Sequence, residues 1–298
     1  MKFEIIYILT FFYLIGYILK TYFIKSGIFW GNLNKINNLV FLPTLFFFAA
    51  YKQTLNINFT IVSLLIYFIA GLSVFVILYF NLKRTNFNTE KMTSLYICSF
   101  GLNYSYIAAI SLILLNQEFT YIILNILIFI IIITILVEYY LAIRYNLSNV
   151  SLKQLLKRLF FKPIIVAFFI GKLLNYYNIP LAYHLNFSLY NCTIAFLPIA
   201  LIYFGSLISS VKLKNINSEI LLCSLLKLLI FPILVIFLGK IIFLEVNILL
   251  FLAIISAMPV GYEVSCNNML NNKILALQLT FSILSLPLII YLCNLTLS

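Results

Sequence analysis

Charged residues are scarce in this chain: they make up 9% of its 298 residues, whereas soluble proteins carry about 25%. Aspartate is absent, and all seven acidic residues are glutamates. Hydrophobic residues make up 64%, and no long polar stretch is left that could form a soluble domain. These shortages exclude a soluble globular protein and predict a single all-α integral membrane domain.

The side chains that enzymes and metal sites need are also rare. The only histidine, His184, falls in a predicted loop, and the five cysteines form no Cys-x-x-Cys pair. We therefore expect no enzyme activity, no catalytic residue, no metal site and no cofactor. Since no nucleotide-binding signature is present, any energy for the protein's activity would come from ion or substrate gradients, with H⁺ and Na⁺ as the candidate coupling ions.

Basic residues are the exception to this shortage, and the formal net charge is +12. They lie between apolar runs, where membrane orientation signals occur, so we expect no nucleic-acid partner. When the ten apolar segments given in the next paragraph are numbered in order, the loops after the odd-numbered segments hold 14 Lys and Arg. The loops and the termini on the other side of the membrane hold 4. Because cytoplasmic loops carry the basic excess, both termini are predicted on the non-cytoplasmic side of the cell (inner or plasma) membrane.

Ten apolar runs approach the roughly 20 residues that a helix needs to cross a membrane. Ten segments predict a multi-pass protein, and an even number of crossings places both termini on the same side of the membrane. The predicted segments are Phe3–Leu19, Ile36–Ala50, Ile61–Leu82, Thr93–Asn116, Phe119–Ile143, Pro163–Tyr177, Phe187–Ile208, Glu219–Gly239, Asn247–Leu270 and Ile274–Leu295.

The two halves of the chain are related by an offset of 155 residues. Gly16 precedes Phe41–Pro43 with 27 positions from Gly to Pro, and Gly171 precedes Phe196–Pro198 at the same spacing. Each copy holds five segments, so the second copy must be inverted in the membrane, as is typical of secondary transporters. The predicted repeats are residues 1–148 and 149–298.

The most unusual stretch is Ala257–Asn268, which follows a nearly all-apolar run. It places a proline, a glycine, an acid and two asparagines where a membrane helix should continue. Proline removes a backbone donor, and backbone groups freed in hydrocarbon need new partners. A helix interrupted at Pro259 with the Glu263 carboxylate one turn later therefore predicts a site rather than a lipid-facing surface.

Several stretches resemble the auxin efflux carrier family, which includes plant auxin exporters and bacterial malate and malonate permease-like proteins. They are Gly16–Lys20 with Leu39–Pro43, Lys227–Pro232, Ala257–Pro259 and Leu286-Pro287. The resemblance covers the whole chain and implies an elevator-type carrier. In such a carrier, segments four and nine are interrupted and cross in a mobile bundle of segments three to five and eight to ten, which moves against a scaffold of one, two, six and seven.

Segment four departs from the family pattern. That pattern is roughly Gly-Asn-Thr-Gly, two aromatic or apolar residues, Gly, an apolar residue and Pro. Asn103 falls on the family's Asn, whereas Ser105 and Ala108 replace glycines and Ile110 replaces the proline. The interruption is then softer here, or it is made by Asn103 and Ser105 bonding to the backbone.

The expected function is secondary active transport of a small organic anion, such as a mono- or dicarboxylate, across the lipid bilayer; a homodimer is compatible with this. The residues expected to bind substrate are Asn103, Ser105, Pro259, Gly261 and Glu263, and Glu263 is also the candidate for ion coupling. The secondary candidates are Pro43, Pro198, Lys227 and Asn267. Lys227 either snorkels to the cytoplasmic interface or pairs with Glu263. Two alternatives stay open: a sodium-coupled symporter of the bile-acid type and a transport-inactive membrane sensor.

Overall fold

The computed structural model describes residues 4–54, 57–83, 89–114, 117–144, 154, 156–157, 160–209, 217–260 and 268–297. Helices dominate these residues, and no strand occurs among them. The helices, with η marking π-helical turns, are α1 (Glu4–Ile18), η1 (Leu19–Phe23), α2 (Gly27–Ile36), η2 (Asn37–Phe41), α3 (Leu42–Lys52), α4 (Ile57–Lys83), α5 (Thr89–Phe100), α6 (Tyr104–Leu114), α7 (Gln117–Arg144), α9 (Pro163–Tyr176), α10 (Tyr183–Ser209), α11 (Ser218–Leu225), η3 (Leu226–Ile230), α12 (Phe231–Ile241), α13 (Val246–Ser256) and α14 (Asn268–Leu297).

Six helical stretches in the described part of the chain are long and apolar enough to cross a membrane. They are Gly27–Lys52, Thr60–Asn81, Thr120–Val137, Tyr183–Ile208, Ser218–Ile241 and Lys273–Cys293. Three shorter apolar helices are Tyr7–Phe23, Pro163–Tyr176 and Val246–Ser256. The prediction of a multi-pass, all-helical membrane protein is therefore confirmed, whereas the count of ten spans stays a prediction.

The second predicted segment, Ile36–Ala50, is too short, because the helix begins at Gly27 and continues to Lys52. Ser26 starts it: the Ser26 hydroxyl accepts a hydrogen bond from the Phe29 N–H at 3.4 Å, as an N-cap residue does. Trp30 is buried in its first turns and donates its indole N–H to the Ile24 carbonyl at 2.7 Å. The sequence analysis missed the helical turns of residues 27–35 because polar residues interrupt the apolar pattern there.

Two predicted loop positions are also helical. The loop expected at residues 271–273, between segments nine and ten, lies inside α14. His184 is the second residue of α10 rather than part of a loop, and its side chain is exposed. In both places, polar residues at the end of a helix resemble a loop in the sequence, although the backbone continues its hydrogen-bonded turns.

Contacts divide the chain into two compact units. Unit 1 comprises residues 1–57, 105–129 and 152–210, and unit 2 comprises 58–104, 130–151 and 211–298. Predicted segments one, two, six and seven thus fall in unit 1, and segments three, eight, nine and ten fall in unit 2. Segments four and five contribute residues to both.

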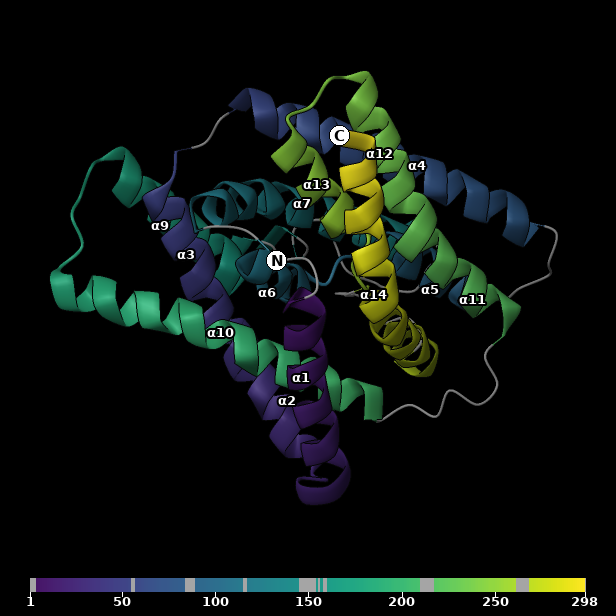
Figure 1. Ribbon diagram of the computed structural model, residues 1–298, viewed down its shortest axis with the longest axis horizontal. Coiled ribbons are helices and arrows are strands. Elements are labelled where there is room, and N and C mark those ends of the chain that lie inside the picture. The colour runs from purple at the N-terminus through teal and green to yellow at the C-terminus, as the bar shows by residue number, and fades with distance from the viewer. Residues whose placement is uncertain are drawn as a thin grey trace. The chain divides into compact units, whose positions relative to one another are not determined.

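Unit 1 is held together by two close helix pairs, α1 with α10 and α3 with α9 (Figure 1). A Cβ atom at Gly16 of α1 would overlap the Ile202 carbonyl of α10, and one at Gly171 of α9 would overlap the Phe47 carbonyl of α3. Small residues allow this backbone-to-backbone approach between membrane helices. Gly171 lies 155 positions after Gly16, and Ile202 lies 155 positions after Phe47, so the two contacts have the same offset.

Unit 2 contains the three C-terminal helices, α12, α13 and α14, packed in sequence, with α13 touching both of the others (Figure 1). A core cluster joins them: Ile236, Leu249, Ala253, Ala257, Ile289 and Cys293. The short helix α5 packs on α11 and α14 in the same unit. This packing fixes the ends of α5 and α13, the helices that lead into the two interruptions.

Candidate functional site

The first interruption separates α5 from α6. Helix α5 ends at Phe100, residues 101–103 are not helical, and α6 starts at Tyr104. The Gly101 N–H still donates to the Ile97 carbonyl at 2.7 Å, so α5 closes with an ordinary turn. Asn103 stands directly before α6, in the position where asparagine is a favoured helix cap. The interruption thus forms without the proline of the family pattern.

The second interruption follows α13. This helix ends at Ser256, and the Ala257 N–H bonds to the carbonyls of Ala253 and Ile254, both at 3.1 Å. Pro259 and Val260 are not helical and are buried. Helix α13 thus ends three residues before Pro259, whose ring nitrogen has no N–H to continue the helical ladder.

The two interruptions meet through their backbones. The Asn103 N–H donates to the Pro259 carbonyl at 3.3 Å, and both residues belong to unit 2. Each group has lost its helical partner at an interruption, and in hydrocarbon such a group needs a replacement. Asn103 and Pro259, two of the predicted site residues, are thus brought into direct contact.

Gln278 on α14 joins the same arrangement, and the sequence reasoning missed it. Its side-chain Oε1 accepts from the Val260 N–H at 2.7 Å, and its Nε2 donates to the Cys98 carbonyl at 3.3 Å. Gln278 is completely buried. One amide therefore bonds to backbone next to both interruptions. The available signal was a glutamine inside the apolar segment Ile274–Leu295, because polar residues within membrane helices are costly and mark built sites.

Ser105, another predicted site residue, is directed to a different partner. Its hydroxyl donates to Asn38 Oδ1 at 2.9 Å, within unit 1. Asn38 Nδ2 in turn donates to Asn34 Oδ1 at 3.0 Å. Asn38 belongs to the π-helical turn η2, and such turns are often found at functional sites. The expected bond from the Ser105 side chain to the backbone at the interruption is therefore replaced by a side-chain bond to segment two.

Lys227 does not snorkel to the cytoplasmic interface. It lies in η3 with its side chain fully buried, and its Nζ is 4.7 Å from the centre of the Phe231 ring. An aromatic face can hold a desolvated cation, which lets this ammonium stay inside the protein. Full burial of the Lys227 side chain does not fit snorkelling into solvent, and its pairing with Glu263 stays a prediction because Glu263 lies outside the described residues.

The two secondary prolines lie in unit 1. Pro43 lies inside the continuous helical stretch Gly27–Lys52, directly after the π-helical turn η2, where the regular hydrogen-bond ladder is already altered. Pro198 lies inside α10, which continues past it to Ser209. Three further candidates, Gly261, Glu263 and Asn267, lie outside the described residues.

The described groups define what the arrangement can bind. The start of α6 at Tyr104 presents the positive end of a helix dipole next to Asn103, which suits an anion. The ends of α5 and α13 present carbonyls, which suit a cation. No group of three or more metal-ligating side chains occurs among the described residues. Comparison of the chain with protein-family models and with curated proteins gives no match, so the interrupted helices themselves are the basis for assigning a function.

Proposed function

We propose that this chain is a secondary active transporter of the auxin efflux carrier type, which moves a small organic anion such as a mono- or dicarboxylate. The observation that carries the proposal is the hydrogen bond between the Asn103 N–H and the Pro259 carbonyl. Irregular backbone deep in a membrane protein is tolerated where it is buried in protein or lines a cavity. Transporters use paired interruptions of this kind to hold a substrate.

The backbone donors and the helix dipole at the first interruption support an anion. The start of α6, directly after Asn103, offers backbone N–H donors and a positive dipole end. Gln278 fixes the surrounding backbone, so these donors are held in place before a substrate arrives. Binding groups that are already ordered lose less entropy on binding, which favours affinity.

The equal offsets in unit 1 support an inverted repeat. Gly16 contacts Ile202, and Gly171 contacts Phe47. Gly171 lies 155 positions after Gly16, and Ile202 lies 155 positions after Phe47. The helices that lead into the interruptions end at Phe100 and Ser256, which differ by 156 positions. Reciprocal pairs of this kind are what two copies related by a pseudo-twofold axis would make.

The division into two units supports an elevator-type motion in part: segments three and eight to ten lie in unit 2 as expected, whereas residues 105–129 of segments four and five lie in unit 1 rather than with the moving bundle. Such a motion needs one body to carry the interruptions and another to stay in place. Unit 2 holds the hydrogen-bonded pair Asn103 and Pro259, and unit 1 holds the close glycine contacts of Gly16 and Gly171. Close backbone packing through glycines suits the static body.

The test is flux through purified protein in liposomes. Uptake of a panel of radiolabelled mono- and dicarboxylates is measured with no gradient, with a pH gradient and with a sodium gradient. We expect saturable uptake of at least one carboxylate above that of empty liposomes. Binding of a carboxylate without flux under any gradient would contradict the proposal and indicate a sensor.

The coupling ion is tested with Glu263→Gln. If Glu263 carries a proton, this variant keeps exchange of internal for external substrate but loses the response to the pH gradient. Glu245→Gln is the matched control, because Glu245 is exposed and makes no side-chain bond at the start of α13. Unchanged pH-driven uptake in Glu263→Gln would remove this residue from the coupling mechanism.

A further inference from the structure

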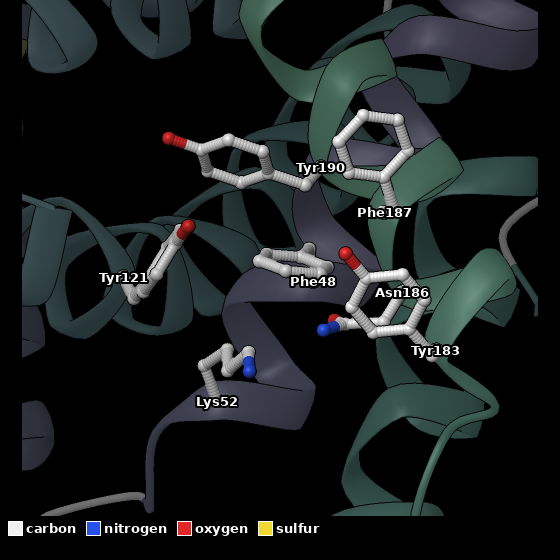
Figure 2. A pocket seen from close by; sticks show the side chains of 7 residues that line it. All are labelled: Phe48, Lys52, Tyr121, Tyr183, Asn186, Phe187 and Tyr190. Carbon is white, nitrogen blue, oxygen red and sulfur yellow. The ribbon is translucent and has the colours of Figure 1, made fainter.

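Unit 1 contains a pocket of about 370 Å³. None of the residues that line it belongs to α5, α6 or α13, the helices beside the two interruptions. It is formed by the end of α3, the start of α10 and the second turn of α7 (Figure 2). Its volume is at the low end of the range for small-molecule sites, about 300–1,000 Å³. The pocket therefore suits a small polar group rather than a large ligand.

Aromatic rings make most of the wall. Phe48 is buried at its centre, with the Tyr121 ring 5.8 Å away in an edge-on arrangement and the Tyr190 ring 6.1 Å away. Tyr183 and Phe187 stand on the opposite side from Tyr121 (Figure 2). These rings hold each other in position, so the wall is preformed.

The polar groups of the pocket are one cation, one amide and tyrosine hydroxyls. Lys52 is the only charged residue among the seven that line it, and its Nζ lies 5.3 Å from the centre of the Phe48 ring. Figure 2 shows the Asn186 amide and the Tyr183 hydroxyl pointing toward the same space. Asn186 Oδ1 is buried and has no hydrogen-bond partner among the described residues. The pocket therefore offers positive charge together with a buried acceptor that needs a donor.

The pocket lies at the ends of two candidate membrane-spanning helices, Gly27–Lys52 and Tyr183–Ile208. Lys52 is the last residue of α3 and Tyr183 the first of α10, so helix ends surround the opening. The outward surface nearby is aromatic, with Tyr183 77% and Phe187 56% exposed. Exposed tyrosines at helix ends are typical of the level of lipid headgroups.

We propose that this pocket binds the phosphate of an anionic phospholipid whose headgroup also carries a hydroxyl, as in phosphatidylglycerol. The Lys52 ammonium and the Tyr183 hydroxyl donate to the phosphate, and the positive end of the α10 dipole favours the same charge. The headgroup hydroxyl donates to Asn186 Oδ1. The glycerol backbone and acyl chains then leave past Phe187, whose exposed ring faces lipid.

Other ligands fit these groups less well. A cationic headgroup would meet the Lys52 ammonium, although aromatic walls alone would attract it. An apolar molecule would leave both the ammonium and Asn186 Oδ1 without partners, at a desolvation cost for each. A free organic phosphate shares the chemistry of the lipid headgroup and is distinguished by experiment.

The experiment measures lipid bound to the full-length protein by native mass spectrometry after delipidation and addition of defined lipids. The probes share the same acyl chains: phosphatidylglycerol, phosphatidylcholine, and phosphatidylmethanol, which is anionic but has no headgroup hydroxyl. We expect phosphatidylglycerol to bind about tenfold more tightly than phosphatidylcholine and several-fold more tightly than phosphatidylmethanol.

Two variants and one control locate the binding. Lys52→Gln should weaken phosphatidylglycerol about five- to tenfold, since one cation near an anionic lipid contributes roughly that much. Asn186→Leu should remove the preference for phosphatidylglycerol over phosphatidylmethanol while keeping the preference for anionic lipid. Lys240→Gln is the control, because Lys240 is an exposed lysine of α12 outside the pocket, and it should change neither.

Three outcomes would overturn the proposal. The first is equal phosphatidylglycerol binding by the wild-type protein and Lys52→Gln, and the second is an equal loss in Lys240→Gln. The third is displacement of the lipid by soluble glycerol phosphate at concentrations equal to those of the lipid, which would assign the pocket to a free organic phosphate. Thermal unfolding of each variant in detergent shows that the folds are comparable. The result does not depend on whether the chain transports.

Discussion

Gly16 of α1 lies against the carbonyl group of Ile202 on α10, so closely that no Cβ atom fits between the two backbones. The same relation joins Gly171 of α9 to Phe47 of α3. A third glycine, Gly205 of α10, meets the Tyr13 backbone of α1, so the α1–α10 pair has a glycine on each side. Unit 1 thus owes its two tightest helix crossings to residues with no side chain.

Alanine at these glycines should therefore destabilise the protein. We expect Gly16→Ala and Gly171→Ala each to cost about 1–3 kcal/mol, because the added methyl group overlaps backbone that cannot move aside. Unfolding in detergent, followed by a thiol-reactive or tryptophan probe, measures the loss.

Gly31→Ala is the matched control for the glycine variants. Gly31 lies in α2, and open space surrounds the position of its missing Cβ. Alanine there should stabilise the helix by about 0.5–1 kcal/mol. Equal losses in all three variants would mean that the close approach is not what limits stability.

The amide of Gln278 should be needed for the geometry of the interruptions. In Gln278→Leu, the Val260 N–H and the Cys98 carbonyl both lose a partner. A buried Val260 N–H left unpaired costs about 1–3 kcal/mol, so stability should fall and carboxylate flux should fall with it.

A neighbouring hydroxyl on α14 provides the comparison. Thr280 bonds only to its own helix in the contacts described, through the Leu277 carbonyl at 2.8 Å, so Thr280→Val should stay close to the wild-type protein. If Gln278→Leu unfolds at the same temperature as Thr280→Val, the amide does not support the crossing.

Phe243 is expected to be a destabilising residue in detergent. It follows α12 with φ at 56°, a left-handed conformation that suits Gly or Asn, and its ring is 94% exposed. Asn178 fills the corresponding position after α9 with φ at 51°. The same pair of backbone hydrogen bonds closes both turns. After α12, the Leu244 N–H donates to the Gly239 carbonyl and the Phe243 N–H to the Lys240 carbonyl. After α9, the Ile179 N–H donates to the Leu174 carbonyl and the Asn178 N–H to the Asn175 carbonyl.

Phe243→Asn should therefore raise the free energy of unfolding by about 1 kcal/mol, since the left-handed conformation costs a bulky residue about 1–2 kcal/mol. The reverse change, Asn178→Phe, should lower it by a similar amount. Thermal unfolding of both variants in detergent measures the pair. A loss of stability in Phe243→Asn would show that the exposed ring makes a contact worth more than the backbone cost.

The predicted topology can be tested by labelling single cysteines in a variant whose five native cysteines are replaced. A membrane-impermeant maleimide should reach Ser151→Cys only from the cytoplasmic side, because the connection between predicted segments five and six holds five Lys and Arg residues. It should reach Tyr177→Cys only from outside, at an exposed turn after α9. Labelling of either cysteine from the opposite side would invert the assignment.

Much of this fold could be predicted from apolar runs alone, because a membrane helix must satisfy its own backbone and reads as a long hydrophobic segment. Pro259 could be found for the same reason, since a proline in such a run has a fixed chemical effect. The ends of helices could not: the turns from Gly27 and the start of α14 at Asn268 hold polar residues that look like loops.

The hydrogen-bond partners of the buried polar residues could not be predicted from the sequence either. Asn38 and Gln278 each bond to groups far away in the sequence, 67 positions for Asn38 with Ser105 and 180 for Gln278 with Cys98. Periodicity describes one helix at a time and carries no information on which helices touch. Lys227 illustrates the same limit, because the Phe231 ring that holds it lies only four positions away, yet its burial depends on the surrounding helices.

The pairing of α1 with α10 sets an order for assembly during synthesis. When α1 leaves the ribosome, its partner begins roughly 165 residues later, at Tyr183. At about 5–20 residues per second, that interval lasts on the order of ten to thirty seconds. Throughout it, the backbone around Gly16 lacks the Ile202 carbonyl group that it contacts in the folded chain. Helix α1 thus waits for its α10 partner while the intervening helices are made, and a chain that stops before Tyr183 would leave α1 without that partner.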